Sequence, residues 1–152
     1  PILDVIARLA LHGPVQVIVG GNRFDAHRLA RVIRRHTVQL DETLARIQQA
    51  RPFTCHQTIA LLADTQPATP IVMIDMLNTF YDENISDAES ARLVGMTVNH
   101  LCGLGKQAPV LLTLRPPTTP ARAGLIKIVQ GIVDWVYVYD APESGHQPPL
   151  LF

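Results

Sequence analysis

The sequence predicts an α/β protein of three layers, with a mostly parallel sheet and helices on both faces. Short uncharged runs such as Val15–Val19 and Ile71–Ile74 have the length and composition of strands that are buried on both sides. The longer segments between them repeat apolar residues at helical spacing. Two of these segments open on a Thr or Ser with a Gln or Glu three residues later, a capping-box pattern. Strands and helices therefore alternate, as in a doubly wound sheet.

The first half of the chain is expected to hold a helix, a strand, a helix, a strand and a helix. Apolar residues at helical spacing precede the breaker His12-Gly13-Pro14, and Asp25 can cap the second helix. The fourth segment is either a strand or a strand preceded by a short helical turn. The expected elements are Pro1–Leu11, Val15–Val19, Ala26–His36, Leu44–Arg51 and Thr54–Asp64.

The second half continues the alternation. An apolar strand ends in a carboxylate, Ser86 and Glu89 open the longest helix, and the sequence RPPTTP forms a loop before the last helix and strand. The expected elements are strand Pro70–Asp75, helix Ser86–Gly105, strand Ala108–Thr113, loop Arg115–Pro120, helix Ala121–Gln130 and strand Trp135–Tyr139.

Length and composition indicate one globular domain over residues 1–140, followed by an irregular tail over 141–152. The net charge of zero argues against strong nonspecific attraction to nucleic acid through the whole surface. Cys55 and Cys102 lie far apart without a CxxC partner, so neither a disulfide framework nor a zinc site is indicated. No apolar run reaches the length of a membrane span, and we expect a cytoplasmic protein without a membrane partner.

Asp75 is the first candidate site residue because it directly follows a buried strand. Ligands of open α/β sheets bind at the carboxyl ends of the strands. In nucleotide hydrolases, an Asp at such a position holds Mg²⁺ beside the phosphates. The alternative interpretation is a strand-end carboxylate that bonds only to backbone or water.

A second candidate is the basic outer face of the helix Ala26–His36. The segment from Arg23 to Arg51 carries seven arginines against three acids. This face either contacts phosphate or an acidic partner, or is the solvated face of an amphipathic helix. Its candidate contact residues are Arg28, Arg31 and Arg35.

Four segments, in order, resemble the ATPase core of the RecA/RadA recombinases. They are VQVIVGGNRF from Val15, ARPFTCHQ from Ala50, the Walker B-like PIVMID from Pro70 and PVLLTLR from Pro109. The most specific of them is ARPFTCHQ, which is similar to the family's Ala-Arg-Ala-Phe followed by His-Gln. This resemblance implies a RecA-like P-loop NTPase fold and spans nearly the whole chain.

The sequence departs from the family where nucleotide chemistry is done. It contains no GxxxxGK[ST] loop, and the first helix resembles the one that would follow that loop. Gly21 stands where the family has a water-orienting carboxylate, and Arg115 stands where it has a γ-phosphate-sensing Gln. Asp75 remains as a remnant of the nucleotide and metal site. We therefore expect no catalytic residue, no bound metal and no cofactor.

The absence of the phosphate-loop strand has a structural implication. In the family, that strand lies between the equivalent of Ala108–Thr113 and the later strands. Without it, Ala108–Thr113 either presents an open edge or pairs directly with Trp135–Tyr139. Because unpaired buried backbone is costly, another segment or a second chain is expected to fill the gap.

The resemblance implies a non-catalytic interaction module, an accessory or paralogue-type protein of DNA repair or recombination. Its expected partners are a second copy or a recombinase-like protein. One alternative is a part of a composite ATPase, with the phosphate loop supplied elsewhere and Mg²⁺-ATP as cofactor. Another is a weak single-stranded-DNA binder. It would use Arg115 and Arg122, which the resemblance indicates in the loop after the fourth strand, together with the basic helix Ala26–His36.

Overall fold

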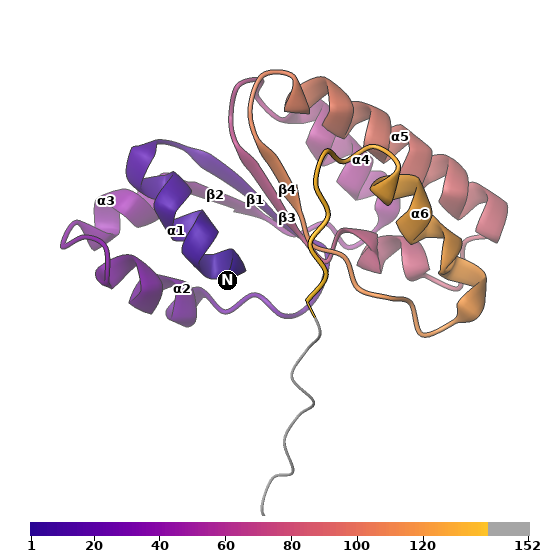
Figure 1. The fold of residues 1–152 in the computed structure, drawn as a ribbon, viewed down its shortest axis with the longest axis horizontal. Helices are drawn as coiled ribbons and strands as arrows, with labels where there is room; N and C mark the ends of the chain where they lie inside the picture. The colour runs from indigo at the N-terminus through magenta and orange to yellow at the C-terminus, as the bar shows by residue number, and fades with distance from the viewer. Residues whose placement is uncertain (140–152) are drawn as a thin grey trace, which may run out of the picture.

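The computed structural model describes residues 1–139, in which helices and strands alternate (Figure 1). The predicted tail over 141–152 lies outside the described residues. The elements, with η marking 3₁₀-helices, are α1 (Ile2–His12), β1 (Val15–Val19), α2 (Ala26–Arg34), α3 (Leu40–Ala45), β2 (Ile47–Ala50), α4 (Cys55–Asp64), β3 (Ile71–Ile74), η1 (Met76–Tyr81), α5 (Asp87–Gly105), β4 (Val110–Leu112), η2 (Pro120–Arg122) and α6 (Gly124–Gln130).

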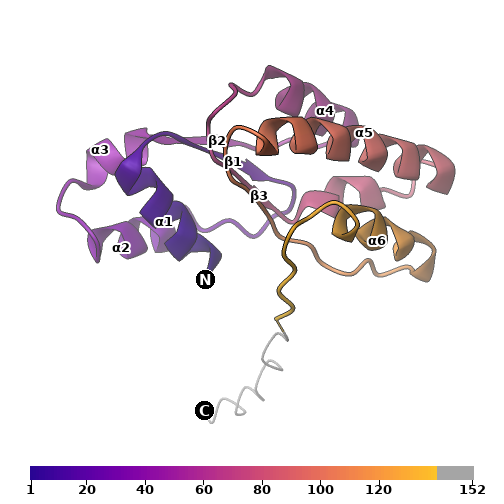
Figure 2. The ribbon, with the colours of Figure 1, turned by 45° about the horizontal axis from the view of Figure 1, so that its top comes forward.

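The four strands form one parallel sheet in the order β2-β1-β3-β4. Helices α1, α2 and α3 lie on one side of the sheet, and α4, α5 and α6 lie on the other (Figures 1 and 2). All four residues of β3 are buried, as expected of a central strand covered on both faces. The predicted α/β class, with a parallel sheet and helices on both faces, is confirmed.

Alternate side chains of the two central strands enter two separate cores, because successive residues of a strand point to opposite faces. The core beneath α1 and α2 includes Val15, Val17, Val19, Val72 and Ile74 from the sheet, together with Ile6 and Ile33. The core beneath α4 and α5 includes Ile18, Ile71 and Met73 from the sheet, together with Leu62, Phe80 and Leu93.

Three helices begin at the caps that the sequence indicates. In each, a side-chain oxygen accepts a hydrogen bond from a backbone N–H of the first turn, which would otherwise lack a partner. The bonds join Arg28 N to Asp25 Oδ1 (2.9 Å), Gln57 N to Thr54 Oγ1 (3.1 Å) and Glu89 N to Ser86 Oγ (3.2 Å).

Several predicted boundaries are corrected by the structure. For Leu44–Arg51, the second of the two alternatives is confirmed, because the last turn of α3 precedes the strand β2. The Arg46 guanidinium fixes this junction by donating to the carbonyls of Ala10 and Leu11 at 3.2 and 3.0 Å. The predicted helix Ala121–Gln130 divides into η2 and α6, and the 3₁₀-helix η1 directly follows Asp75.

The predicted strand Trp135–Tyr139 is wrong, since this segment has irregular backbone and exposed side chains. Its high β propensity produces no strand because it pairs with no neighbour among the described residues, and a strand is stable only as part of a ladder. Strand β4 pairs with β3 alone and is shorter than the predicted Ala108–Thr113. Within residues 1–139, β4 therefore forms an open edge of the sheet.

Among these residues, no helix has both the length and the apolar character needed to cross a membrane.

Substitution of Phe80 tests how much the core beneath α5 contributes to the free energy of unfolding. Its side chain is fully buried, whereas Phe53 is largely exposed. We expect Phe80→Ala to lower the free energy of unfolding by about 3–5 kcal/mol, because it leaves a cavity. The control Phe53→Ala should change it by less than about 1 kcal/mol. Urea unfolding followed by circular dichroism measures both, and equal effects would contradict this assignment of the core.

Candidate functional site

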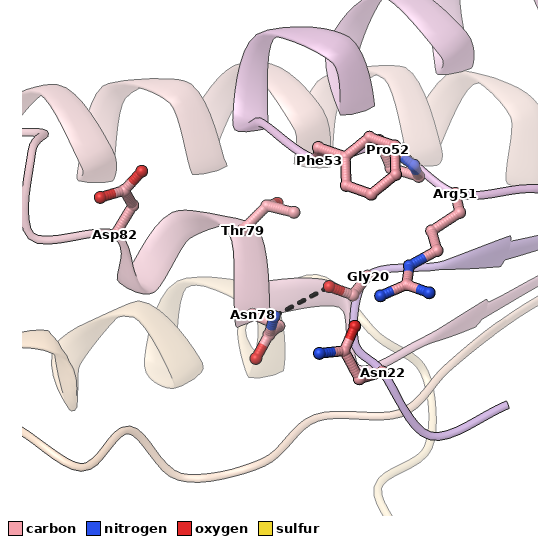
Figure 3. Close-up of a pocket in the computed structure, with 8 residues that line it drawn as sticks. All are labelled: Gly20, Asn22, Arg51, Pro52, Phe53, Asn78, Thr79 and Asp82. Atoms are coloured by element: carbon pink, nitrogen blue, oxygen red, sulfur yellow. Dashed lines mark hydrogen bonds between the residues drawn. The ribbon is translucent and has the colours of Figure 1, made fainter.

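The candidate site lies where β1, β2 and β3 end, at the carboxyl edge of the parallel sheet. A cavity of about 220 Å³ opens there, and Figure 3 shows the side chains around it. Its walls come from the segments that directly follow the three strands. The lining residues are Gly20, Asn22, Arg51, Pro52, Phe53, Asn78, Thr79 and Asp82.

Asp75 lies at the end of β3 with its hydrogen bonds supplied by the protein itself. Its N–H donates to Thr113 Oγ1 at 2.8 Å, and its Oδ1 lies 2.8 Å from Arg115 Nε. The carboxylate side chain is only 9% exposed. Asp75 also has a left-handed backbone, with φ 52° and ψ 49°, which is uncommon for a residue other than glycine. The strand-end carboxylate is thus engaged in an internal ion pair.

The turn Gly20–Gly21 lies against Asp75 so closely that neither glycine can carry a side chain without a shift. A Cβ at position 20 would lie 2.4 Å from the Asp75 carbonyl oxygen, and one at position 21 would lie 2.9 Å from Asp75 Oδ2. The Gly20 N–H donates to the Ile74 carbonyl at 2.8 Å, and Asn78 Nδ2 donates to the Gly20 carbonyl at 2.9 Å (Figure 3). With Asp75 in this position, a carboxylate side chain at position 21 has no room.

The cavity is lined by polar groups of several kinds, both charged and neutral. The Arg51 guanidinium carbon lies 5.6 Å from the centroid of the Phe53 ring, a cation–π distance. Asn22, Asn78 and Thr79 add amide and hydroxyl groups, and Asp82 adds a carboxylate. Within residues 1–139, no three His, Cys, Asp or Glu side chains gather into a metal-binding cluster.

The loop that carries Arg115 is held by Tyr81, whose hydroxyl donates to the Arg115 carbonyl at 2.7 Å. Burial raises the pKa of Tyr81 to about 12. The phenol therefore stays protonated, and stays a donor, throughout the neutral range. This bond helps to place the Arg115 guanidinium against Asp75.

Arg122 is buried, and its guanidinium is engaged inside the fold. It donates to the carbonyls of Phe80 at 3.0 Å, Asp82 at 3.2 Å and Ile85, and it pairs with Asp87 at 2.8 Å. The fork of donors in one guanidinium suits such a cluster of carbonyl oxygens. Arg122 therefore clamps the loop between η1 and α5, and its donors do not face solvent as a DNA contact requires.

The three arginines that the sequence indicates are exposed: Arg28 and Arg31 in α2, and Arg35, which directly follows α2 and keeps helical backbone angles. Spacings of three and four residues place them on one side of the helix, away from buried Leu29 and Ile33. None of them forms a salt bridge with an acid in residues 1–139. Because α2 and η1 belong to opposite cores, this arginine face is separate from the Asp75–Arg115 pair.

The site contains residues that the sequence interpretation did not select. Asn22, Arg51 and Asn78 line the cavity, whereas the sequence indicates only Asp75 and Arg115 as candidates near this edge. Each of them follows a strand by one to four residues, and side chains just beyond strand ends gather at one edge of a parallel sheet. Their position just after a strand end is the feature of the sequence that could have identified them.

No protein-family model matches this chain, and no curated protein matches it.

The close approach of Gly20 to Asp75 leads to a prediction about stability. We expect Gly20→Ala to lower the free energy of unfolding by about 1–3 kcal/mol, because its Cβ would overlap a backbone oxygen. Gly95, inside α5, has no atom within 4 Å of an added Cβ. Gly95→Ala should therefore raise the free energy of unfolding by about 0.5–1 kcal/mol. Chemical unfolding measures both, and a neutral Gly20→Ala would show that the turn and the strand end are not tightly packed.

Proposed function

We propose that this chain is a non-catalytic RecA/RadA-like interaction module, an accessory or paralogue-type protein of cytoplasmic DNA repair or recombination. The resemblance of four segments supports the family, and the parallel α/β fold is consistent with it. The observation that carries the non-catalytic part is the Asp75–Arg115 ion pair, at 2.8 Å. The carboxylate that would serve Mg²⁺ in a nucleotide hydrolase is bound to the chain's own guanidinium.

The remainder of the strand edge supports the same conclusion. Phosphoryl transfer depends on positioning and on charge stabilisation by a phosphate cradle, a metal and a residue that orients water. The sequence has no phosphate-loop motif, and Gly21 has no room for a water-orienting carboxylate while Asp75 holds its present position. These residues favour a scaffold over a hydrolase.

The proposed contact surface for a protein partner is the arginine face of α2, formed by Arg28, Arg31 and Arg35. Three exposed arginines on one side of a helix present guanidinium donors in an arrangement that suits carboxylates. The partner is therefore a protein with an acidic surface, and a recombinase-like subunit is the candidate that the resemblance supplies.

Nucleotide titration tests the non-catalytic assignment. We expect isothermal titration of the protein with Mg²⁺-ATP to give no saturable binding up to millimolar nucleotide, because the sequence contains no phosphate-loop motif. The same titration on Asp75→Ala is the control. Micromolar binding by the unmodified chain that Asp75→Ala abolishes would overturn the scaffold proposal and favour the composite ATPase.

Charge reversal tests the arginine face. We expect Arg28→Glu/Arg31→Glu to weaken binding to a purified RecA/RadA-type recombinase at least tenfold, because like charges would then face each other. The control Lys106→Glu/Lys127→Glu makes the same change of net charge on exposed residues of other segments. Equal losses in both variants would show a nonspecific charge effect. Absence of any binding by the unmodified chain would remove this class of partner.

Single-stranded DNA remains an alternative partner, with less support from the geometry. Arg122 is clamped internally and Arg115 is paired with Asp75, so neither guanidinium is free for phosphate in this conformation. This alternative would therefore rely on the exposed arginines of the basic helix. Binding of an oligothymidylate with an affinity that falls steeply with salt would favour the alternative, since released counterions produce that dependence.

A further inference from the structure

The open edge of β4 presents unpaired backbone groups on an apolar strand. The Pro109 carbonyl accepts from Ile71 N at 3.0 Å, and Thr113 N donates to the Met73 carbonyl at 2.9 Å. In a parallel ladder, alternate residues direct their N–H and C=O to the same neighbour. Val110 and Leu112 therefore direct their backbone groups away from β3, toward the free edge. Such an edge is a template for another strand.

The opposite edge of the sheet differs in character. Strand β2 carries Gln48 and Gln49, both exposed, at its centre. All three residues of β4 are apolar, and Leu111 remains 38% exposed. An apolar strand therefore buries more apolar surface by adding to β4 than by adding to β2, and is stabilised more there.

The segment Trp135–Tyr139 has the composition of the strand that this edge lacks. It alternates aromatic and β-branched residues and contains no charge, a pattern of high β propensity. Its five side chains are between 52% and 83% exposed. Period-two alternation places Trp135, Tyr137 and Tyr139 on one side of an extended chain and both valines on the other. A run of this kind is rarely left uncovered in a monomer.

We propose that Trp135–Tyr139 of one copy adds as a strand to the β4 edge of a second copy. This inference rests on the proposed function as an interaction module, and it takes a second copy as one of the partners and assigns the surface that binds it. The exchange is reciprocal: each copy contributes one strand and accepts one, so a two-fold dimer closes and leaves neither β4 edge free.

A second copy is the occupant that the observations favour. Within residues 1–139, each copy has both a segment and a sheet edge without a pairing strand, so a second copy can pair with both at once. Because the net charge is zero, two copies do not repel each other electrostatically at long range. Three aromatic side chains bury about 150–250 Å² each, so two exchanged segments can bury about 900–1,500 Å² from aromatics alone. That range overlaps the size of a standard stable interface, about 1,200–2,000 Å².

The single tryptophan of the chain, Trp135, reports the exchange directly. We expect its fluorescence to shift to shorter wavelength as protein concentration rises, while light scattering shows the mass doubling over the same range. Val138→Asp should abolish both changes because it places a charge in the donated strand. The control Val38→Asp alters another exposed valine and should leave both changes intact.

Variants of the accepting strand test the other half of the interface. Leu111→Lys places a charge beside the free edge, and Leu112→Pro removes an N–H that faces it. Both should abolish dimerisation, with far-ultraviolet circular dichroism checking that each variant remains folded. Gln49→Lys makes the comparable change on β2 and should leave the dimer intact.

Mixing the two kinds of variant gives the sharpest test. Val138→Asp retains a working edge, and Leu111→Lys retains a working strand. An equimolar mixture should therefore regain dimers through one intact exchange, although each variant alone stays monomeric. Failure of this complementation while the unmodified chain dimerises would place the interface elsewhere and overturn the proposal.

Two further results would overturn it. A monomer whose Trp135 emission stays that of exposed tryptophan at all concentrations shows that no second copy binds. A monomer whose Trp135 is covered at every concentration shows that the segment pairs within its own chain. Both readouts are independent of Mg²⁺-ATP titration and of recombinase binding, so failure of the strand exchange is distinguishable from failure of the proposed function.

Discussion

The fit between the Gly20–Gly21 turn and the backbone of Asp75 determines how the functional edge of this protein is built. Strands β1 and β3 pair in parallel up to their last residues, and the hydrogen bond from Gly20 N–H to the Ile74 carbonyl continues that pairing beyond the strand end. The chain can come so close only without side chains. Asp75 is thereby held in its left-handed conformation, with its carboxylate beside Arg115. The ion pair and the cavity wall both depend on this contact.

Much of the fold follows from local sequence signals. The runs at Val15–Val19 and Ile71–Ile74 could be assigned because central strands of a parallel sheet are short, mostly apolar and free of charge. The caps at Asp25, Thr54 and Ser86 fixed three helix starts through one short-range hydrogen bond each. Trp135–Tyr139 could not be judged in the same way, because its propensity for a strand is local whereas the presence of a pairing neighbour is a property of the whole sheet.

The candidate site was predicted in part. Asp75 could be found because a carboxylate after a buried strand is conspicuous, but its ion pair with Arg115 joins positions 40 residues apart and depends on the pairing of β3 with β4. The buried position of Arg122 could not be predicted from the sequence either. A loop arginine has the same appearance in a sequence whether it faces solvent or binds carbonyls. Only the packing of η1 against α5 supplies Arg122 with three carbonyl acceptors.

The Arg122 clamp also determines where the polypeptide can be cut. Trypsin must draw an arginine side chain out of its substrate and bind the surrounding backbone in extended form. Extraction of Arg122 would leave the carbonyls of Phe80, Asp82 and Ile85 without their donors and would break the contact with Asp87. The Arg122–Ala123 bond is thus protected for as long as the junction of η1 and α5 is intact. Its cleavage therefore reports that this junction has opened.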